Sequence, residues 1–110
     1  MVAARKAYQA WRLTPAPRRA EILFRAAELL RDRKDELGRL VTREMGKVVS
    51  EGLVDIQEAV DLAYYMAGEG RRLVGETVPS ELPDKDCKSI RVPHGVFALI
   101  TPWNFPSAML

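Results

Sequence analysis

The sequence is poor in the residues that build covalent links and metal sites. Its 110 residues include one cysteine, Cys87, and one histidine, His94. A single cysteine cannot form a disulfide within the chain, which fits a reducing cytoplasm better than a secreted protein. One imidazole without a partner makes neither a metal site nor a catalytic dyad. We therefore predict a cytoplasmic chain with no metal ligands, in which Cys87 is a structural thiol and His94 is a turn residue.

The chain also lacks a block of charge of one sign and a long apolar run. Seventeen Lys and Arg face fifteen Asp and Glu, and the net charge is only +2. Because the charges alternate along the chain, they predict no nucleic-acid partner. No stretch approaches the roughly 18 consecutive apolar residues of a membrane span, and the N-terminus lacks the apolar core of a signal peptide. These absences predict a soluble chain with no membrane partner.

Helical periodicity is what the first 74 residues do contain. Residues 3–12 are expected to form a short helix that buries Tyr8 and Trp11 on one side. Thr14 is a candidate N-cap for a second helix over residues 17–31, because proline is tolerated in the first turn. The residues expected on the apolar face of this second helix are Leu23, Ala26, Ala27 and Leu30.

Two further helices are predicted before residue 74. One ends at Gly46, in the manner of a C-terminal capping glycine, and the other runs from about Ser50 to Leu73. The apolar stripe of the fourth helix is wide, which implies a second contact surface. That stripe comprises Leu53, Ile56, Val60, Ala63 and Ala67, widened by Leu62, Tyr64, Tyr65 and Met66. The carboxylates Glu44, Glu51, Asp55, Glu58 and Asp61 are expected to form a solvated surface and not catalytic pairs.

Extended segments replace helices after Gly75, where five prolines punctuate the chain. Residues 87–92 alternate in part between apolar and polar side chains, which is typical of a half-exposed strand that needs a partner. Residues 96–100 are five consecutive apolar residues, and they suit a strand buried on both faces. A short apolar run alone does not exclude a buried helical segment.

The loop after this apolar run has the composition of a ligand site. It reads Thr101-Pro102-Trp103-Asn104-Phe105-Pro106, with one side-chain amide between two aromatic rings. The prolines stiffen the loop, and in open α/β sheets ligands bind beyond the carboxyl ends of strands. The Asn104 amide donates two hydrogen bonds without carrying charge, as an oxyanion or a cofactor amide requires. The alternative is a proline-rich turn whose rings only fill the core.

A family resemblance favours the ligand-site interpretation. The stretch from Arg91-Val92-Pro93-His94-Gly95-Val96 to Ile100-Thr101-Pro102-Trp103-Asn104-Phe105-Pro106 resembles the first nucleotide-binding strand of the NAD(P)-dependent aldehyde dehydrogenases. Upstream, Glu44-Met45-Gly46-Lys47, Tyr64-Tyr65-Met66-Ala67-Gly68-Glu69-Gly70 and Gly75-Glu76-Thr77-Val78-Pro79-Ser80 are similar to the same family in the same order. The resemblance covers nearly the whole chain.

The resemblance implies a mainly α chain with a few β-strands, a piece of the α/β, Rossmann-like aldehyde dehydrogenase fold. Residues 1–74 would pack on the cofactor domain, residues 75–95 would belong to the oligomerisation sheet, and residues 96–110 would hold the first nucleotide-binding strand with its asparagine loop. A homo-oligomer is therefore expected. Asn104 matches the family asparagine that stabilises the oxyanion. The positions that match the wall of the NAD or NADP cleft are Ile100, Thr101, Pro102, Trp103 and Asn104.

The same resemblance predicts that this chain alone is inactive. Family members are several times longer, so we expect an N-terminal, internal piece of a longer protein. The family's nucleophilic cysteine and general-base glutamate match no position here, and catalysis loses orders of magnitude without either. We expect no cofactor bound by this chain and an aldehyde as the substrate of the parent enzyme. A rival interpretation is a non-catalytic, self-associating helical interaction module, whose exposed stripes and strand edges favour oligomers.

Overall fold

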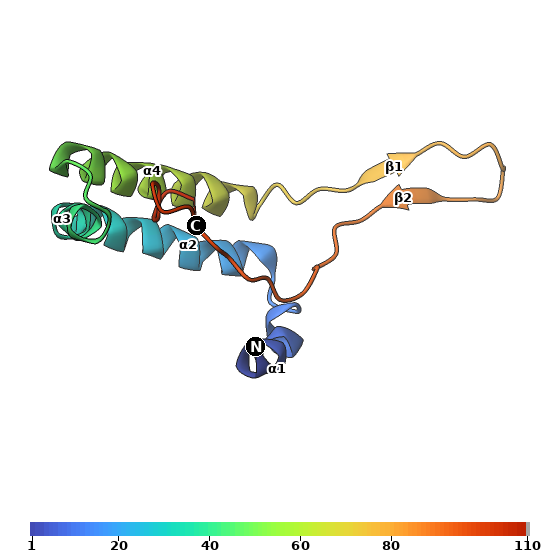
Figure 1. The fold of residues 1–110 in the computed structure, drawn as a ribbon. Helices are drawn as coiled ribbons and strands as arrows, with labels where there is room; N and C mark the ends of the chain where they lie inside the picture. Colours follow the sequence, from blue (N-terminus) through green and yellow to red (C-terminus); the bar gives the residue numbers. More distant parts are fainter. Residues whose placement is uncertain (110) are drawn as a thin grey trace.

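The computed structural model describes residues 1–109, which contain four helices and a two-stranded hairpin (Figure 1). The helices are α1 (Val2–Trp11), α2 (Ala16–Asp32), α3 (Lys34–Met45) and α4 (Val49–Glu69). The strands β1 (Glu76–Val78) and β2 (Cys87–Ser89) follow them. The predicted mainly α fold with a few strands is confirmed.

The core lies where α4 packs along α2 and α3. Figure 1 shows α2 and α4 side by side, with α3 at one end of the pair. Small side chains such as Ala27 and Ala59 are buried there, so the helices approach closely. The buried apolar residues are Ala20, Ala27, Val41, Ile56, Ala59, Val60 and Ala108. The predicted apolar face of α2 is only partly correct, because Ala27 is fully buried whereas Leu23 is 41% exposed.

The crossing of α3 and α4 depends on glycine. A Cβ atom placed on Gly52 would meet the carbonyl oxygen of Gly38 and lie 2.9 Å from the Thr42 Oγ1. The Thr42 hydroxyl itself donates a hydrogen bond to the Gly38 carbonyl oxygen at 3.2 Å. The two helices therefore touch backbone to backbone at this point, where a methyl group would force them apart.

The helix ends follow the sequence signals in one case and depart from them in two. Gly46 ends α3 in the left-handed conformation (φ 84°), as predicted, because only glycine adopts this φ without strain. The predicted N-cap at Thr14 is wrong, since Pro15 holds that position and the Thr14 hydroxyl donates back to the Ala10 carbonyl oxygen at 3.4 Å. Helix α4 ends at Glu69, not at Leu73, and Gly70 then lies against Ala20 of α2.

Helix α1 does not bury the aromatic rings assigned to its inner side. Trp11 is 45% exposed, Tyr8 is half-buried, and α1 contains no buried residue. Within residues 1–109, α1 packs against no other helix or strand, and this is why its apolar face has no cover. Its long-range side-chain hydrogen bond runs from the Tyr8 hydroxyl to the Pro93 carbonyl oxygen at 3.5 Å.

The hairpin projects from the helices as an arm (Figure 1). Strands β1 and β2 are antiparallel, with Glu76 opposite Ser89 and Val78 opposite Cys87. The strand predicted over residues 87–92 is thus shorter than expected, and its partner is the segment immediately upstream. That these residues belong to an oligomerisation sheet stays a prediction.

Residues 96–100 run back from the hairpin toward the helices without forming a strand. Ile100 is 94% exposed and Phe97 is 70% exposed, so burial on both faces is wrong for this structure. A strand needs a neighbour that accepts and donates its backbone hydrogen bonds, and within residues 1–109 β1 and β2 pair only with each other. The assignment of residues 96–110 to a nucleotide-binding strand and loop stays a prediction.

Candidate functional site

The Asn104 loop lies against the helices at the N-terminal end of α4. Trp103, Asn104 and Phe105 form one side of a groove with a volume of about 580 Å³. The opposite side comes from the α3–α4 connection and the first turns of α4. Its residues are Met45, Lys47, Ser50, Glu51, Val54 and Glu58. The structure thus brings a loop from the end of the chain onto residues about fifty positions earlier.

Lys47 holds this loop at Asn104 itself. Its Nζ donates a hydrogen bond of 2.7 Å to the backbone carbonyl oxygen of Asn104. The same ammonium lies 4.3 Å from the centre of the Phe105 ring, within the range of a cation–π interaction. A turn hydrogen bond from the Phe105 N–H to the Pro102 carbonyl oxygen, 3.3 Å long, closes the loop on itself.

Asp55 holds the backbone just after the loop, which corrects the assignment of Asp55 to the solvated surface. The side chain is fully buried in α4. Its Oδ1 accepts a hydrogen bond from the Ala108 N–H at 3.1 Å, and its Oδ2 accepts one from the Ser107 N–H at 3.3 Å. The other four acidic residues of the predicted surface, Glu44, Glu51, Glu58 and Asp61, are exposed as expected.

The Asn104 side chain itself is exposed at the groove. Within residues 1–109 no hydrogen bond engages its amide group, although its carbonyl oxygen and the backbone just after it are held. A primary amide offers two N–H donors and one acceptor without a net charge. The arrangement suits a donor that meets an oxygen atom entering the groove.

The five residues assigned to the cofactor cleft do not form an enclosed site. Ile100 is 94% exposed, Trp103 is 78% exposed, and Pro102 is also exposed. Of the five, Trp103 and Asn104 line the groove. These residues offer one surface to a dinucleotide and do not surround it, so they fit the cofactor only in part.

The remaining candidates lie outside this site. Cys87 is a half-buried free thiol in β2, on the hairpin arm. The His94 ring meets the Phe97 ring edge to face, with 6.1 Å between their centres. Among residues 1–109, no three His, Cys, Asp or Glu side chains come together as a metal site would require. In the same part of the chain, no helix is long and apolar enough to cross a membrane.

Known proteins share both this sequence and this fold. Residues 1–110 match the sequence model of the aldehyde dehydrogenase family. The chain belongs to that family. The glutarate-semialdehyde dehydrogenase of Pseudomonas putida is 44% identical over 108 residues, which cover 98% of this chain and 22% of that enzyme. The chain therefore spans about a fifth of the length of such relatives.

Solved aldehyde dehydrogenase structures contain the same arrangement of elements. An Escherichia coli NADP-dependent enzyme superposes with a TM-score of 0.91 at 43% identity, over 97% of this chain and 22% of that chain. The betaine aldehyde dehydrogenase of Staphylococcus aureus, solved with NAD+, superposes with a TM-score of 0.90 at 31% identity. That match covers 98% of this chain and 22% of the other. The helices and hairpin are thus part of the aldehyde dehydrogenase fold, and family relatives use NAD+ or NADP+.

Two residues of the site were missed by the sequence analysis. Lys47 was part of a family motif, but nothing in the sequence linked it to a loop 57 positions later. Asp55 did carry a signal, because it lies three residues after Gly52 and four before Ala59, on a face of small residues. A carboxylate on the same helix face as glycine and alanine indicates a buried anion. The other acidic residues nearby suggested a polar surface and hid this signal.

Proposed function

We propose that this chain supplies the oxyanion-stabilising asparagine of an NAD(P)-dependent aldehyde dehydrogenase, together with one wall of its cofactor cleft. The parent reaction is the oxidation of an aldehyde to a carboxylate. The observation that carries the proposal is the Asn104 loop, whose backbone is fixed by Lys47 and Asp55 while its side-chain amide stays exposed at the groove.

Asn104 is proposed to act where charge develops. When a thiolate attacks an aldehyde carbon, the carbonyl oxygen becomes an oxyanion, and a fixed N–H donor stabilises that charge more than it stabilises the neutral carbonyl. An amide held by its backbone needs little reorganisation at that moment. The apolar wall of the groove, including Val54 and Phe105, would hold the carbon chain of the aldehyde and displace water.

Ile100, Thr101, Pro102, Trp103 and Asn104 are proposed to contribute to the cofactor cleft. NAD(P)+ supplies the hydride acceptor of the reaction when it is bound. Because these residues offer one exposed surface, we propose that the cleft needs further walls and that the 110-residue chain binds no cofactor by itself. The chain offers no match to the family's nucleophile or general base, so we also propose that it is inactive alone.

Two measurements test this proposal. The purified chain should form no NAD(P)H from glutarate semialdehyde or any other aldehyde, and measurable formation would contradict the proposal. A chimera in which this chain replaces the matching residues of the Pseudomonas putida enzyme should be active. In that chimera Asn104→Ala should lower kcat about a hundredfold or more. The matched amide change Gln9→Ala, on the unpacked helix α1, should not.

A second candidate is the self-associating helical module. The observation in its favour is apolar surface on α4 that is exposed in the chain alone, including Leu62, Tyr65 and Met66. The two functions are compatible, because the proposed parent enzyme is a homo-oligomer. If the chain were only a self-associating module, it would form a defined oligomer, and the Asn104→Ala change would not lower the activity of the chimera.

A further inference from the structure

Asp55 is a buried carboxylate that the proposed reaction does not use. Its side chain has no exposed surface, and its neighbours along the same face of α4 are the small or apolar residues Gly52, Ile56 and Ala59. Removing a carboxylate from water is expensive unless hydrogen bonds replace its hydration. The position of Asp55 therefore requires donors from outside the helix.

Those donors all come from the two residues that follow the Asn104 loop. In the described chain, the hydrogen bonds of Asp55 are those from the Ser107 and Ala108 backbone N–H groups, one to each carboxylate oxygen. Charged acceptors form stronger hydrogen bonds to backbone N–H than neutral ones do. The carboxylate thus fixes two successive peptide units, three and four residues after Asn104.

Lys47 fixes the peptide unit directly after Asn104. Its ammonium donates to the Asn104 carbonyl oxygen and lies over the Phe105 ring. The two residues reach the loop from different places: Lys47 lies in the connection after α3, and Asp55 lies in the second turn of α4. The ammonium of Lys47 donates to a backbone carbonyl oxygen, and the carboxylate of Asp55 accepts from two backbone N–H groups.

We propose that Asp55 and Lys47 are positioning residues, which hold the Asn104 carbonyl group and the backbone just after it so that the Asn104 amide stays at the groove. This inference rests on the proposed function, since it names the residues that preorganise the same oxyanion donor. Neither residue touches the reacting atoms. Their effect on the reaction passes through the geometry of Asn104.

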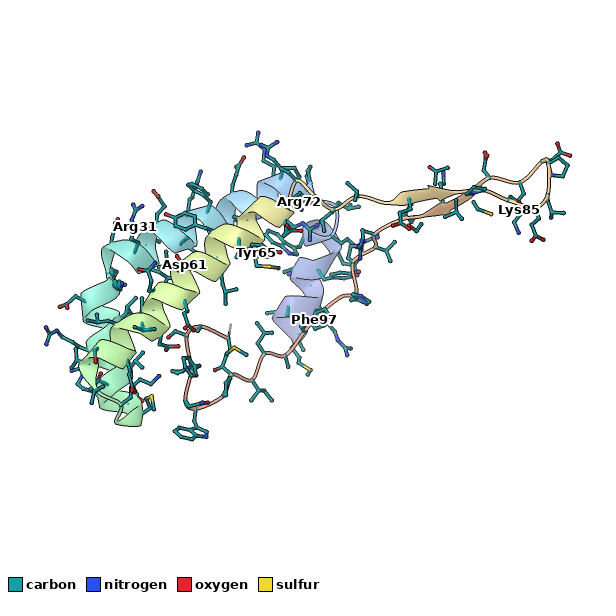
Figure 2. All side chains as sticks on the ribbon, turned by 90° about the horizontal axis from the view of Figure 1, so that it is seen from above. Arg31, Asp61, Tyr65, Arg72, Lys85 and Phe97 are labelled. Carbon is teal, nitrogen blue, oxygen red and sulfur yellow. The ribbon has the colours of Figure 1, made fainter. Side chains whose placement is uncertain are left out.

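Asp55→Asn is the decisive variant, because it keeps the size of the side chain but turns one acceptor into an N–H₂ donor that faces a backbone N–H. In the 110-residue chain, amide hydrogen exchange followed by NMR should become at least about tenfold faster at Ser107 and Ala108. Amides buried between α2 and α4 should keep their protection. Asp61→Asn, the matched change at an exposed position of α4 (Figure 2), should leave all of these amides unchanged.

Each other outcome decides against the inference. Unchanged exchange at Ser107 and Ala108 would show that the carboxylate does not hold the loop. Equally faster exchange in the loop and in all the helices, or failure of Asp55→Asn to fold, would show that Asp55 stabilises the whole chain and not the loop in particular.

Lys47→Met should speed exchange at Phe105 in the same selective way, and Lys47→Arg should restore part of the protection.

The functional readout uses the chimera with the Pseudomonas putida enzyme. Asp55→Asn and Lys47→Met should lower kcat about tenfold or more, with a smaller change in KM, because a donor that is displaced affects the transition state most. An inactive chimera whose loop amides respond as predicted would contradict the proposed function and leave the anchoring intact. An active chimera that neither variant slows would contradict the positioning role alone.

Discussion

Gly52 lies at the closest approach of α3 and α4, and it offers a sharp test of the packing. Gly52→Ala should lower the free energy of unfolding by about 1–3 kcal/mol, because the added methyl group meets the backbone of Gly38 and the Thr42 hydroxyl. The matched control is Gly68→Ala in the same helix, where a Cβ meets nothing within 4 Å. That change should raise stability by about 0.5 kcal/mol. Urea unfolding measures both, and a Gly52→Ala chain as stable as Gly68→Ala would refute the close crossing.

Tyr64 joins α4 to α2 and should titrate late. Burial raises the pKa of its hydroxyl, and the hydrogen bond that it donates to Glu28 at 3.0 Å raises that pKa further. The positive charge of Arg31 opposes these effects. The hydroxyl in the unfolded chain has a pKa of about 10. Since the folded value is higher, the contribution of Tyr64 to stability is complete below that pH and is lost as the pH rises through the folded value.

Absorbance at 295 nm, which follows tyrosinate formation, checks this prediction. Glu28→Gln should move the Tyr64 pKa down toward its ordinary value, and Tyr64→Phe should remove the late step from the titration. A late step that persists in Tyr64→Phe would belong to another tyrosine and would contradict the assignment.

Single residues also show why part of the site could not be predicted. Asn104 was singled out by its proline and aromatic neighbours within one short segment, and the family resemblance favoured a ligand site over a turn that only fills the core. The roles of Lys47 and Asp55 depend on partners more than fifty residues away. The helical pattern predicts the helix face on which a side chain lies, but it does not predict which distant backbone groups will bind that side chain.

At the scale of elements, α1 is the part least tied to the rest. It packs against no other described helix or strand, and its long-range side-chain hydrogen bond is that of Tyr8. Deletion of residues 1–11 should therefore change the free energy of unfolding of α2–α4 by less than about 1 kcal/mol. Urea unfolding followed by helical circular dichroism measures this. A loss of several kcal/mol would show that α1 is part of the core.

The helices and part of the hairpin could be predicted from the sequence, whereas the strand expected over residues 96–100 is not formed, for a physical reason. The 3.6-residue pattern and the Gly46 stop are local, and α2–α4 form within a few residues of their expected bounds. The strand over residues 96–100 was inferred from apolar composition, but a strand exists only beside a partner. Without a partner in the described chain, residues 96–100 form no strand, and Phe97 on this segment is exposed (Figure 2).

At the scale of the whole molecule, the exposed apolar side chains predict self-association. Leu62 on α4 is 44% exposed, and Ile100 on the returning segment is almost fully exposed. Large exposed apolar surfaces mark sites of contact with another protein. Static light scattering of the 110-residue chain should give a mass above the 12.4 kDa of a monomer.

The double variant Leu62→Lys with Ile100→Lys should return that mass to the monomer value. Gln9→Lys adds one of the same charges on α1 and serves as the control. A wild-type chain that scatters as a monomer at all concentrations would contradict this prediction and, with it, the self-associating module.

The hairpin arm, which ends near Lys85 (Figure 2), has a hydrodynamic consequence. The chain measures 63 × 31 × 23 Å and has a radius of gyration of 18.8 Å, whereas a compact chain of this length would have about 13 Å. An elongated particle meets more friction than a sphere of equal mass. A monomer should therefore diffuse slowly and leave a gel-filtration column early, at the position of a heavier globular protein.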